Sequence, residues 1–181
     1  KNRVMKNIVK PFNINFSALK LGEHKFDYKF DNQFFKDYLY EGFLDAKFQG
    51  FVKLIKKESA LELTFNLVGE VFLACDLTNE EFWHPLTSET LLQVKFGKSF
   101  DDTNEELLIL PEGDHTLNVA QYFYELAVLA KPLKVVHPDV IAGKKGQDVL
   151  KKLEQLSPEN LEREEKEEID PRWNKLKDLL N

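Results

Sequence analysis

The sequence predicts an α+β protein built on a long-stranded, strongly curved antiparallel sheet or partial barrel, with packed helices and a flexible C-terminal arm. Three observations predict this. Apolar and polar residues alternate over several long stretches between residues 24 and 96, which is typical of strands with one face toward water. The spacing becomes helical after residue 118. Residues 157–168 then hold six glutamates and almost no apolar side chain.

The first predicted elements are a strand, a short helix and a second strand. Residues 24–30 alternate, with aromatic side chains and one histidine on the same side. Asp31 can accept a hydrogen bond from a first-turn amide, so a capped helix is expected over residues 32–40, ending at Gly42. Residues 46–57 return to a period of two.

The strongest strand pattern covers residues 61–75, where the apolar residues stay at odd-numbered positions. A strand of this length can bend, and Gly69 within it predicts a β-bulge or a close backbone approach. Residues 82–96 alternate again after a polar turn at 76–81. Long strands joined by short turns form a meander, and curling or closing it would hide its edges.

An acidic loop, a short strand and a helix are predicted next. The loop covers residues 101–106, and the strand at 107–110 stops before Pro111. From Asn118 the apolar residues form one broad helical stripe that ends at Pro132 and should pack across the sheet. These elements complete a domain predicted over residues 1–136.

Residues 137–181 are predicted to form a linker, an acidic stretch and a C-terminal helix. The linker covers 141–146, a short helix follows at 148–156, and the acidic stretch cannot offset its own ordering entropy. Asp170 can cap a last helix that starts at Pro171 and carries Trp173 among leucines. We expect this helix to dock on a partner or on the protein's own sheet.

Composition limits the function classes. Cys75 is the one cysteine among 181 residues, which excludes an internal disulfide and a multi-cysteine zinc site and favours a reducing compartment. The sequence contains no apolar run of about 18 residues and no leader pattern. A cytoplasmic protein with no membrane partner is therefore expected.

Charge is unevenly distributed along the chain. Residues 1–60 carry twelve Lys or Arg against seven acidic residues, whereas residues 61–130 carry two against thirteen. A net charge of −6 argues against a general nucleic-acid coat and against DNA as a partner. The basic N-terminal part could still contact RNA phosphates, although ordinary solvated lysines remain the alternative. The candidate contacts are Lys6, Lys10, Lys53, Lys56 and Lys57.

Catalytic and metal sites have little support. Cys75 would need a base to act as a nucleophile, and His84 could lie across the hairpin from it. Buried packing explains the thiol more simply. The four histidines show no ligand spacing, and the acidic loop lacks the glycine and terminal glutamate of a calcium loop. No metal and no cofactor are expected.

Several motifs together resemble the YceD family, the large ribosomal RNA subunit accumulation proteins. The segment from Gly69 to Thr78 is similar to the family's Gly-x-Val-x-x-x-Cys-x-x-Thr/Cys hairpin, and a helix ending in Leu-x-x-Pro follows. The chain closes on an Asp-Pro-Arg-aromatic motif. The motif positions are Gly69, Cys75, Thr78, Glu125, Pro132, His137, Asp170, Pro171 and Arg172.

The resemblance spans about residues 12–180 and implies a role in large-subunit ribosomal RNA accumulation, with no established enzymatic activity. It implies a bacterial protein whose partner is the precursor large ribosomal subunit, through its RNA or its proteins. Arg172 and Trp173 are further candidate contacts. Members with Cys-x-x-Cys have a possible metal pair, but Thr78 holds the second position here. The open alternatives are an RNA-processing or hydrolytic enzyme using Cys75 and His84, and an adaptor that contacts only proteins.

Overall fold

The structure, a computed structural model, describes residues 10–157, which form two compact units. The first unit holds residues 10–74 and 81–135, and the second holds residues 75–80 and 136–157. No helix within these described residues is long and apolar enough to cross a membrane.

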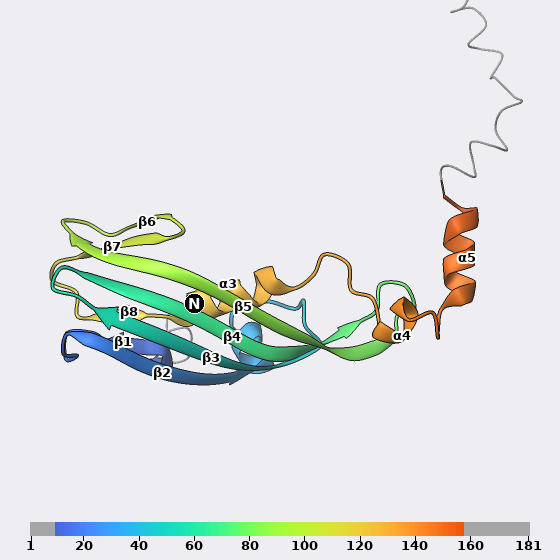
Figure 1. Cartoon of the computed structure of the whole chain (residues 1–181), viewed down its shortest axis with the longest axis horizontal. Helices are drawn as coiled ribbons and strands as arrows, with labels where there is room; N and C mark the ends of the chain where they lie inside the picture. Colours follow the sequence, from blue (N-terminus) through green and yellow to red (C-terminus); the bar gives the residue numbers. More distant parts are fainter. Residues whose placement is uncertain (1–9, 158–181) are drawn as a thin grey trace, which may run out of the picture. The chain divides into compact units, whose positions relative to one another are not determined.

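A six-stranded sheet dominates the first unit (Figure 1). Its spatial order is β2-β3-β4-β5-β7-β6, and all neighbours pair antiparallel except β5 and β7, which pair parallel. The predicted α+β class is confirmed, whereas the sheet is open and neither the strong curvature nor the partial barrel is confirmed. The strands are β2 (Gly22–Asp31), β3 (Asp45–Lys56), β4 (Ala60–Ala74), β5 (Glu81–Gly97), β6 (Asp101–Asn104) and β7 (Leu107–Pro111).

The predicted alternation holds along the long strands. In β4 the odd-numbered side chains from Leu61 to Leu67 are buried, and Val71 and Leu73 continue the row. Gly69 pairs with Phe48 on one side and Leu86 on the other in unbroken register, so the expected bulge is absent there. A Cβ at Gly69 would lie 2.3 Å from the Lys47 carbonyl oxygen, so a close backbone approach explains this glycine.

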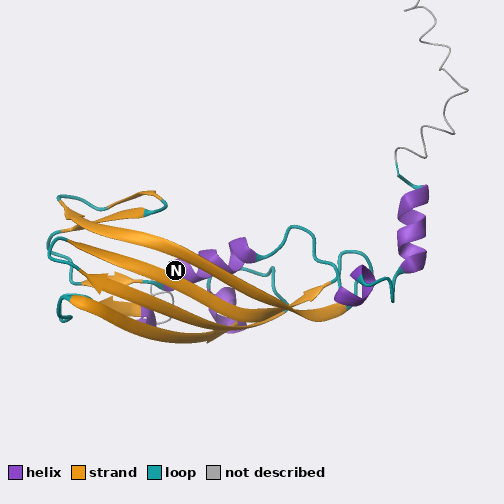
Figure 2. Cartoon of the chain, viewed as in Figure 1, coloured by secondary structure: helices purple, strands orange, loops and turns teal. Residues whose placement is uncertain are grey.

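Helices and a small two-stranded sheet cover one face of the large sheet (Figure 2). We call this the inner face and the opposite one the outer face. The helix α2 contacts β2 and β3, whereas α3 contacts β4 and β5. These covering elements are η1 (Lys10–Phe12), β1 (Asn13–Asn15), α2 (Asn32–Asp37), β8 (Thr116–Asn118) and α3 (Ala120–Ala130).

Aromatic rings fill the space between this layer and the sheet. Phe123 of α3 is 0% exposed, and its ring centroid lies 5.3 Å from that of Tyr28 and 5.7 Å from that of Phe65. The ring packs directly over Gly50 of β3, where an added Cβ would lie 2.4 Å from Phe123 Cε1. The position of the Phe123 ring therefore explains why β3 has a glycine at residue 50.

Two details differ from the predictions. The predicted acidic loop contains β6, because Asp101 and Asn104 pair with β7 and this pairing outweighs the low strand propensity of Asp and Asn. Asp31 caps α2 as expected, but the helix ends at Asp37 rather than at Gly42. Leu39, with a φ of 60°, already turns the chain out of the helical conformation.

The second unit consists of the turn at Cys75–Glu80, the short helix α4 (Pro138–Ile141) and the helix α5 (Gln147–Gln155). The helix predicted at 148–156 is confirmed as α5 within one residue. The predicted linker at 141–146 overlaps the last residue of α4. This short helix starts after His137, whose side chain accepts a hydrogen bond as its N-cap.

Candidate functional site

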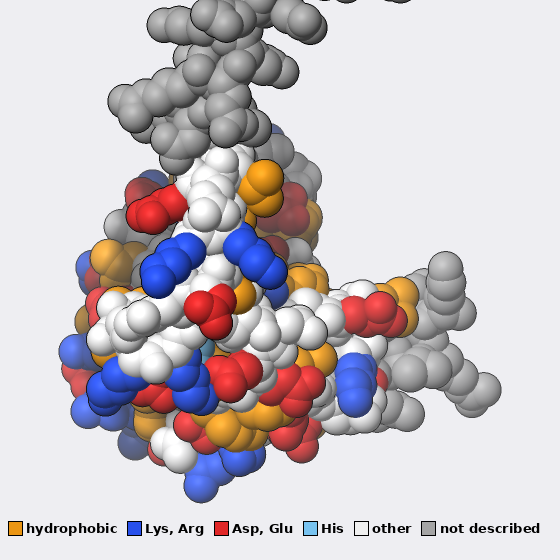
Figure 3. Space-filling model, turned by 90° about the vertical axis from the view of Figure 1, so that its right-hand side faces the viewer, with side chains coloured by type: hydrophobic (Ala, Val, Ile, Leu, Met, Phe, Trp, Pro, Cys, Tyr) orange, Lys and Arg blue, Asp and Glu red, His pale blue; other side chains and the backbone are white. Residues whose placement is uncertain are grey.

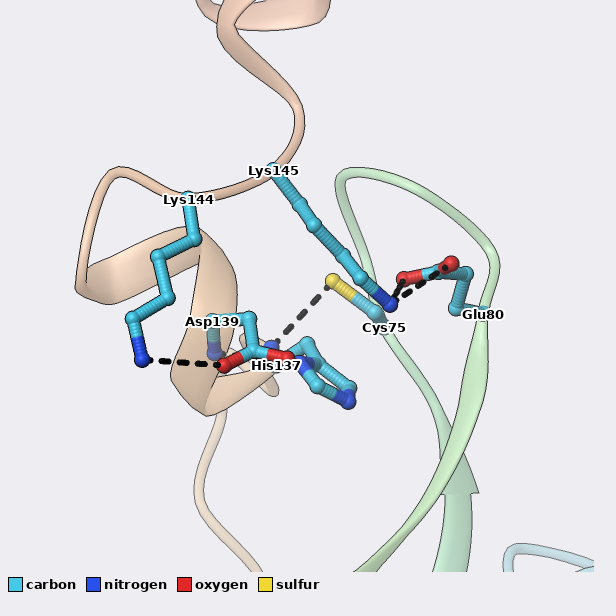
Figure 4. A network of polar contacts seen from close by, with 6 residues as sticks. All are labelled: Cys75, Glu80, His137, Asp139, Lys144 and Lys145. Carbon is cyan, nitrogen blue, oxygen red and sulfur yellow. Dashed lines mark hydrogen bonds and ion pairs between the residues drawn. The ribbon is translucent and has the colours of Figure 1, made fainter.

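Cys75 opens a tight turn in the second unit (Figure 4). Its N–H donates to the Glu80 carbonyl at 2.8 Å, and its carbonyl accepts from the Asn79 N–H at 2.8 Å. Asn79 has a φ of 58°, a conformation that Asn tolerates better than most residues. The turn thus places the thiol at a fixed position, where it is 2% exposed.

The sulfur of Cys75 accepts a hydrogen bond from the backbone N–H of His137 at 3.3 Å. His137 is also the N-cap of α4, since its Nδ1 accepts from the Asp139 N–H at 3.1 Å. Lys145 closes the unit by donating to both Glu80 carboxylate oxygens, at 3.1 and 3.2 Å. The sequence did not predict this contact between Cys75 and His137, although both belong to the family-like motifs.

Hydrogen bonding outweighs burial at this thiol. Burial on its own raises the pKa of Cys75, but the Thr78 hydroxyl and the backbone N–H groups of His137, Leu77 and Thr78 lower that pKa to about 7. The Thr78 hydroxyl is buried and makes no hydrogen bond of ordinary geometry, so the backbone N–H groups are the better-supported cause of the lowered pKa. The Cys75 thiol is therefore more acidic than an ordinary cysteine thiol.

The lowered pKa predicts a pH-dependent stability. An unfolded thiol has a pKa of about 8.5, so the folded state stabilises the thiolate, and this stabilisation is absent well below about pH 7 and complete near pH 9. The free energy of unfolding of the wild-type chain, relative to Cys75→Ser, should rise across that range. Denaturant unfolding of both proteins measures it, and a difference that does not change with pH would contradict the lowered pKa.

The outer face of the large sheet carries the candidate RNA contact Lys53. Cross-strand pairing places it beside Lys25, and both ammonium groups lie near Glu23, at 3.0 and 3.4 Å. Phe51 lies on the same face and is 39% exposed. Lys29 lies on the same face of β2, four residues after Lys25. Basic and aromatic side chains are therefore interleaved at this corner of the sheet.

A second aromatic group lies further along the outer face. Phe72 and Trp83 face each other across β4 and β5 with ring centroids 5.2 Å apart. Lys47 holds its ammonium group 4.2 Å from the Trp83 ring centroid, a distance typical of a cation–π contact, and lies 3.9 Å from Glu70. Elsewhere, one view of the molecule shows acidic and basic side chains interspersed (Figure 3).

Lys53, Lys56 and Lys57 do not form one cationic group. The Lys56 ammonium group donates to the carbonyl oxygens of Phe16 and Leu19, at 2.8 and 2.9 Å, and so holds the loop that follows β1. Lys57 pairs with Glu62. Lys53 alone of the three lies on the outward row with Lys25.

The remaining candidate residues belong to different units or lie outside the described part of the chain. Cys75 belongs to the second unit and His84 to the first, where the His84 ring lies 6.1 Å from that of Phe82. No group of three or more potential metal ligands occurs among the residues that the structure describes. Residues outside the described part, or with undescribed side chains, are Lys6, Lys10, Asp170, Pro171, Arg172 and Trp173.

Comparison with known protein families identifies the family of this chain. Residues 63–180 match the family model described as "Large ribosomal RNA subunit accumulation protein YceD". The chain belongs to the YceD family. The family predicted from the motifs is therefore confirmed, although the match starts at residue 63 and the predicted resemblance started near residue 12. Comparison with curated proteins and with solved structures gave no match.

The YceD match includes the whole Cys75 turn and α3. Thr78 and Gly146 are in close contact, since a Cβ at Gly146 would lie 3.0 Å from the Thr78 side chain. Glu125 is exposed on α3 and accepts from Gln121 at 2.8 Å, and Pro132 follows the C-cap residue Lys131. The family name relates this part of the chain to accumulation of large-subunit ribosomal RNA.

Proposed function

We propose that this chain is a non-enzymatic factor that supports large-subunit ribosomal RNA accumulation, and thus large-subunit assembly, by binding the precursor RNA or its proteins in the cytoplasm. The observation that carries the proposal is the YceD match over residues 63–180. The outer-face lysines beside Phe51 supply groups that contact phosphates and unpaired bases.

The first test measures ribosomal RNA in cells that lack the chain. The ratio of large-subunit to small-subunit ribosomal RNA should fall, and the wild-type chain should restore it. Cys75→Ser should restore the ratio equally well, because a thiol that is 2% exposed is out of reach of a substrate. An unchanged ratio would contradict the role, and failure of folded, normally abundant Cys75→Ser would favour a catalytic or redox function.

The second test concerns RNA binding through the outer face. Replacing Lys25, Lys29 and Lys53 together by glutamate should weaken binding to large-subunit ribosomal RNA. It should also reduce the slope of log affinity against log salt by about 0.7–0.9 for each phosphate that the variant no longer neutralises. These three ammonium groups are exposed, and the ion pairs of Lys25 and Lys53 with Glu23 contribute little to folding.

A matched control separates a specific surface from net charge. Lys20, Lys36 and Lys134 are exposed and lie outside the outer face, so their replacement by glutamate changes the net charge equally and should leave most of the affinity. Lys56 is excluded from the test because its hydrogen bonds to Phe16 and Leu19 are structural. Equal decreases in affinity for both triple variants would contradict a specific RNA-binding surface.

A further inference from the structure

A groove runs beside α3 in the first unit, between that helix, β8 and the β6–β7 hairpin. Its volume is about 710 Å³. The floor is apolar, since Leu108 and Leu110 of β7 and Leu117 of β8 line it and are themselves nearly buried. The groove is not part of the outer face, because Leu108 of β7 pairs with the buried Val94 of β5 and so points to the inner side of the sheet.

The groove walls expose large apolar side chains. Leu129, on the last turn of α3, is 82% exposed, and Phe100, in the turn before β6, is 57% exposed. Exposed apolar side chains that flank an apolar floor are characteristic of a binding groove rather than of scattered surface residues.

The rim of the groove is acidic. Asp102, Glu105, Asp114 and Glu125 line it, from the β6–β7 hairpin, the loop before β8 and α3, and none of its lining residues is Lys, Arg or His. Asp102 and Glu125 act on a common neighbour: burial, followed by these two carboxylates, raises the pKa of the Tyr122 hydroxyl to about 12. The negative charges therefore converge on the space above the apolar floor.

We propose that this groove binds a cationic, partly apolar peptide segment of a protein partner, with Lys or Arg side chains at the acidic rim and apolar side chains on the leucine floor. The negative charge of the rim favours a cationic peptide over RNA. Four carboxylates without a compensating cation among the lining residues repel RNA phosphates, whereas they attract Lys and Arg across a rim that water screens only partly. The site is separate from the lysine face proposed for RNA.

A synthetic peptide with leucine and lysine at helical spacing is a suitable probe. Its binding to the full chain would be measured by fluorescence anisotropy, at low and high salt, against a version in which glutamate replaces every lysine. The lysine peptide should bind and its affinity should fall with salt, and the glutamate peptide should not bind. Because the isolated chain is used, this result is independent of the ribosomal RNA role.

Variants locate the binding. Asp102→Asn with Glu125→Gln should weaken peptide binding about fivefold or more, whereas Glu58→Gln with Glu89→Gln, which removes equal charge elsewhere, should not. Leu129→Ser should weaken it similarly, whereas Leu91→Ser, at a 62% exposed position of the outer face, should not. Equal effects of groove and control variants would overturn the proposal.

Two other occupants would also overturn it. If single-stranded RNA fills the groove instead, a labelled RNA oligonucleotide will bind the wild-type chain, and Leu129→Ser but not Leu91→Ser will weaken that binding. The chain's own C-terminal residues 169–181 carry Arg172 and Lys175 among apolar residues. If they fill the groove, their deletion will raise the affinity for the peptide severalfold. Unchanged affinity for the peptide after deletion, together with RNA binding that Leu129→Ser does not change, supports a protein partner.

Discussion

Replacing Phe123 with alanine is expected to lower the free energy of unfolding by about 3–5 kcal/mol, the range for large-to-small changes at buried aromatic positions. The ring is fully buried and joins α3 to two strands through Tyr28 and Phe65. Its removal leaves a cavity that the sheet cannot close without moving the helix. Urea unfolding followed by circular dichroism measures the change, and a decrease below about 1 kcal/mol would contradict this packing.

The packing of Phe123 on Gly50 allows a sharper measurement. Gly50→Ala alone should cost about 1–3 kcal/mol, because its methyl group meets the Phe123 ring at 2.4 Å. In the Phe123→Ala background the same methyl group enters vacated space, so its cost should fall well below that value. Gly113→Ala is the control, since nothing lies within 4 Å of its added Cβ. Additive costs would show that the ring does not rest on Gly50.

Deleting residues 169–181 is expected to abolish association with the precursor large subunit while leaving the melting temperature of the chain almost unchanged. These residues lie outside the described part of the structure, so the expectation comes from the sequence. At helical spacing Trp173 and the leucines after it would share one apolar face, and burial of each side chain in a partner would contribute about 1.5–3 kcal/mol before ordering costs.

Co-sedimentation with precursor subunits in a density gradient measures this association. Trp173→Ser with Leu176→Ser should reproduce the effect of the deletion, whereas Asp178→Asn, on the polar side, should not. A large drop in melting temperature with association intact would show that the segment stabilises this protein's own fold instead.

Local sequence patterns predicted the long strands and both longer helices. They failed for strands whose formation depends on pairing with another segment of the chain. Strand β4 was visible because its apolar row depends only on its own residues. Strand β6 was not, because Asp101 and Asn104 become a strand only through β7. The parallel pairing of β5 with β7 likewise depends on β6, which comes before β7 in the sequence and forms the edge of the sheet. No pattern within β5 predicts this strand order.

The candidate sites follow the same rule. Cys75 and Thr78 were recognised within one motif, but the hydrogen bond from His137 joins residues 62 positions apart. The uneven charge of residues 61–130 was visible in the sequence, whereas its convergence on a groove was not. Asp102, Asp114 and Glu125 reach one rim only because β6, the loop before β8 and α3 surround one groove.

The β1–β8 pair has a consequence for the order of folding. It joins residues 13–15 to residues 116–118, and the Val119 N–H donates to the Phe12 carbonyl beside it at 3.0 Å. The β2–β5 meander can form from neighbouring hairpins, whereas this pair must wait for nearly the whole domain and carries the largest loop-closure entropy. During synthesis, Phe12 and Ile14 therefore cannot make their contacts with β8 and α3 until residues 116–123 have left the ribosome.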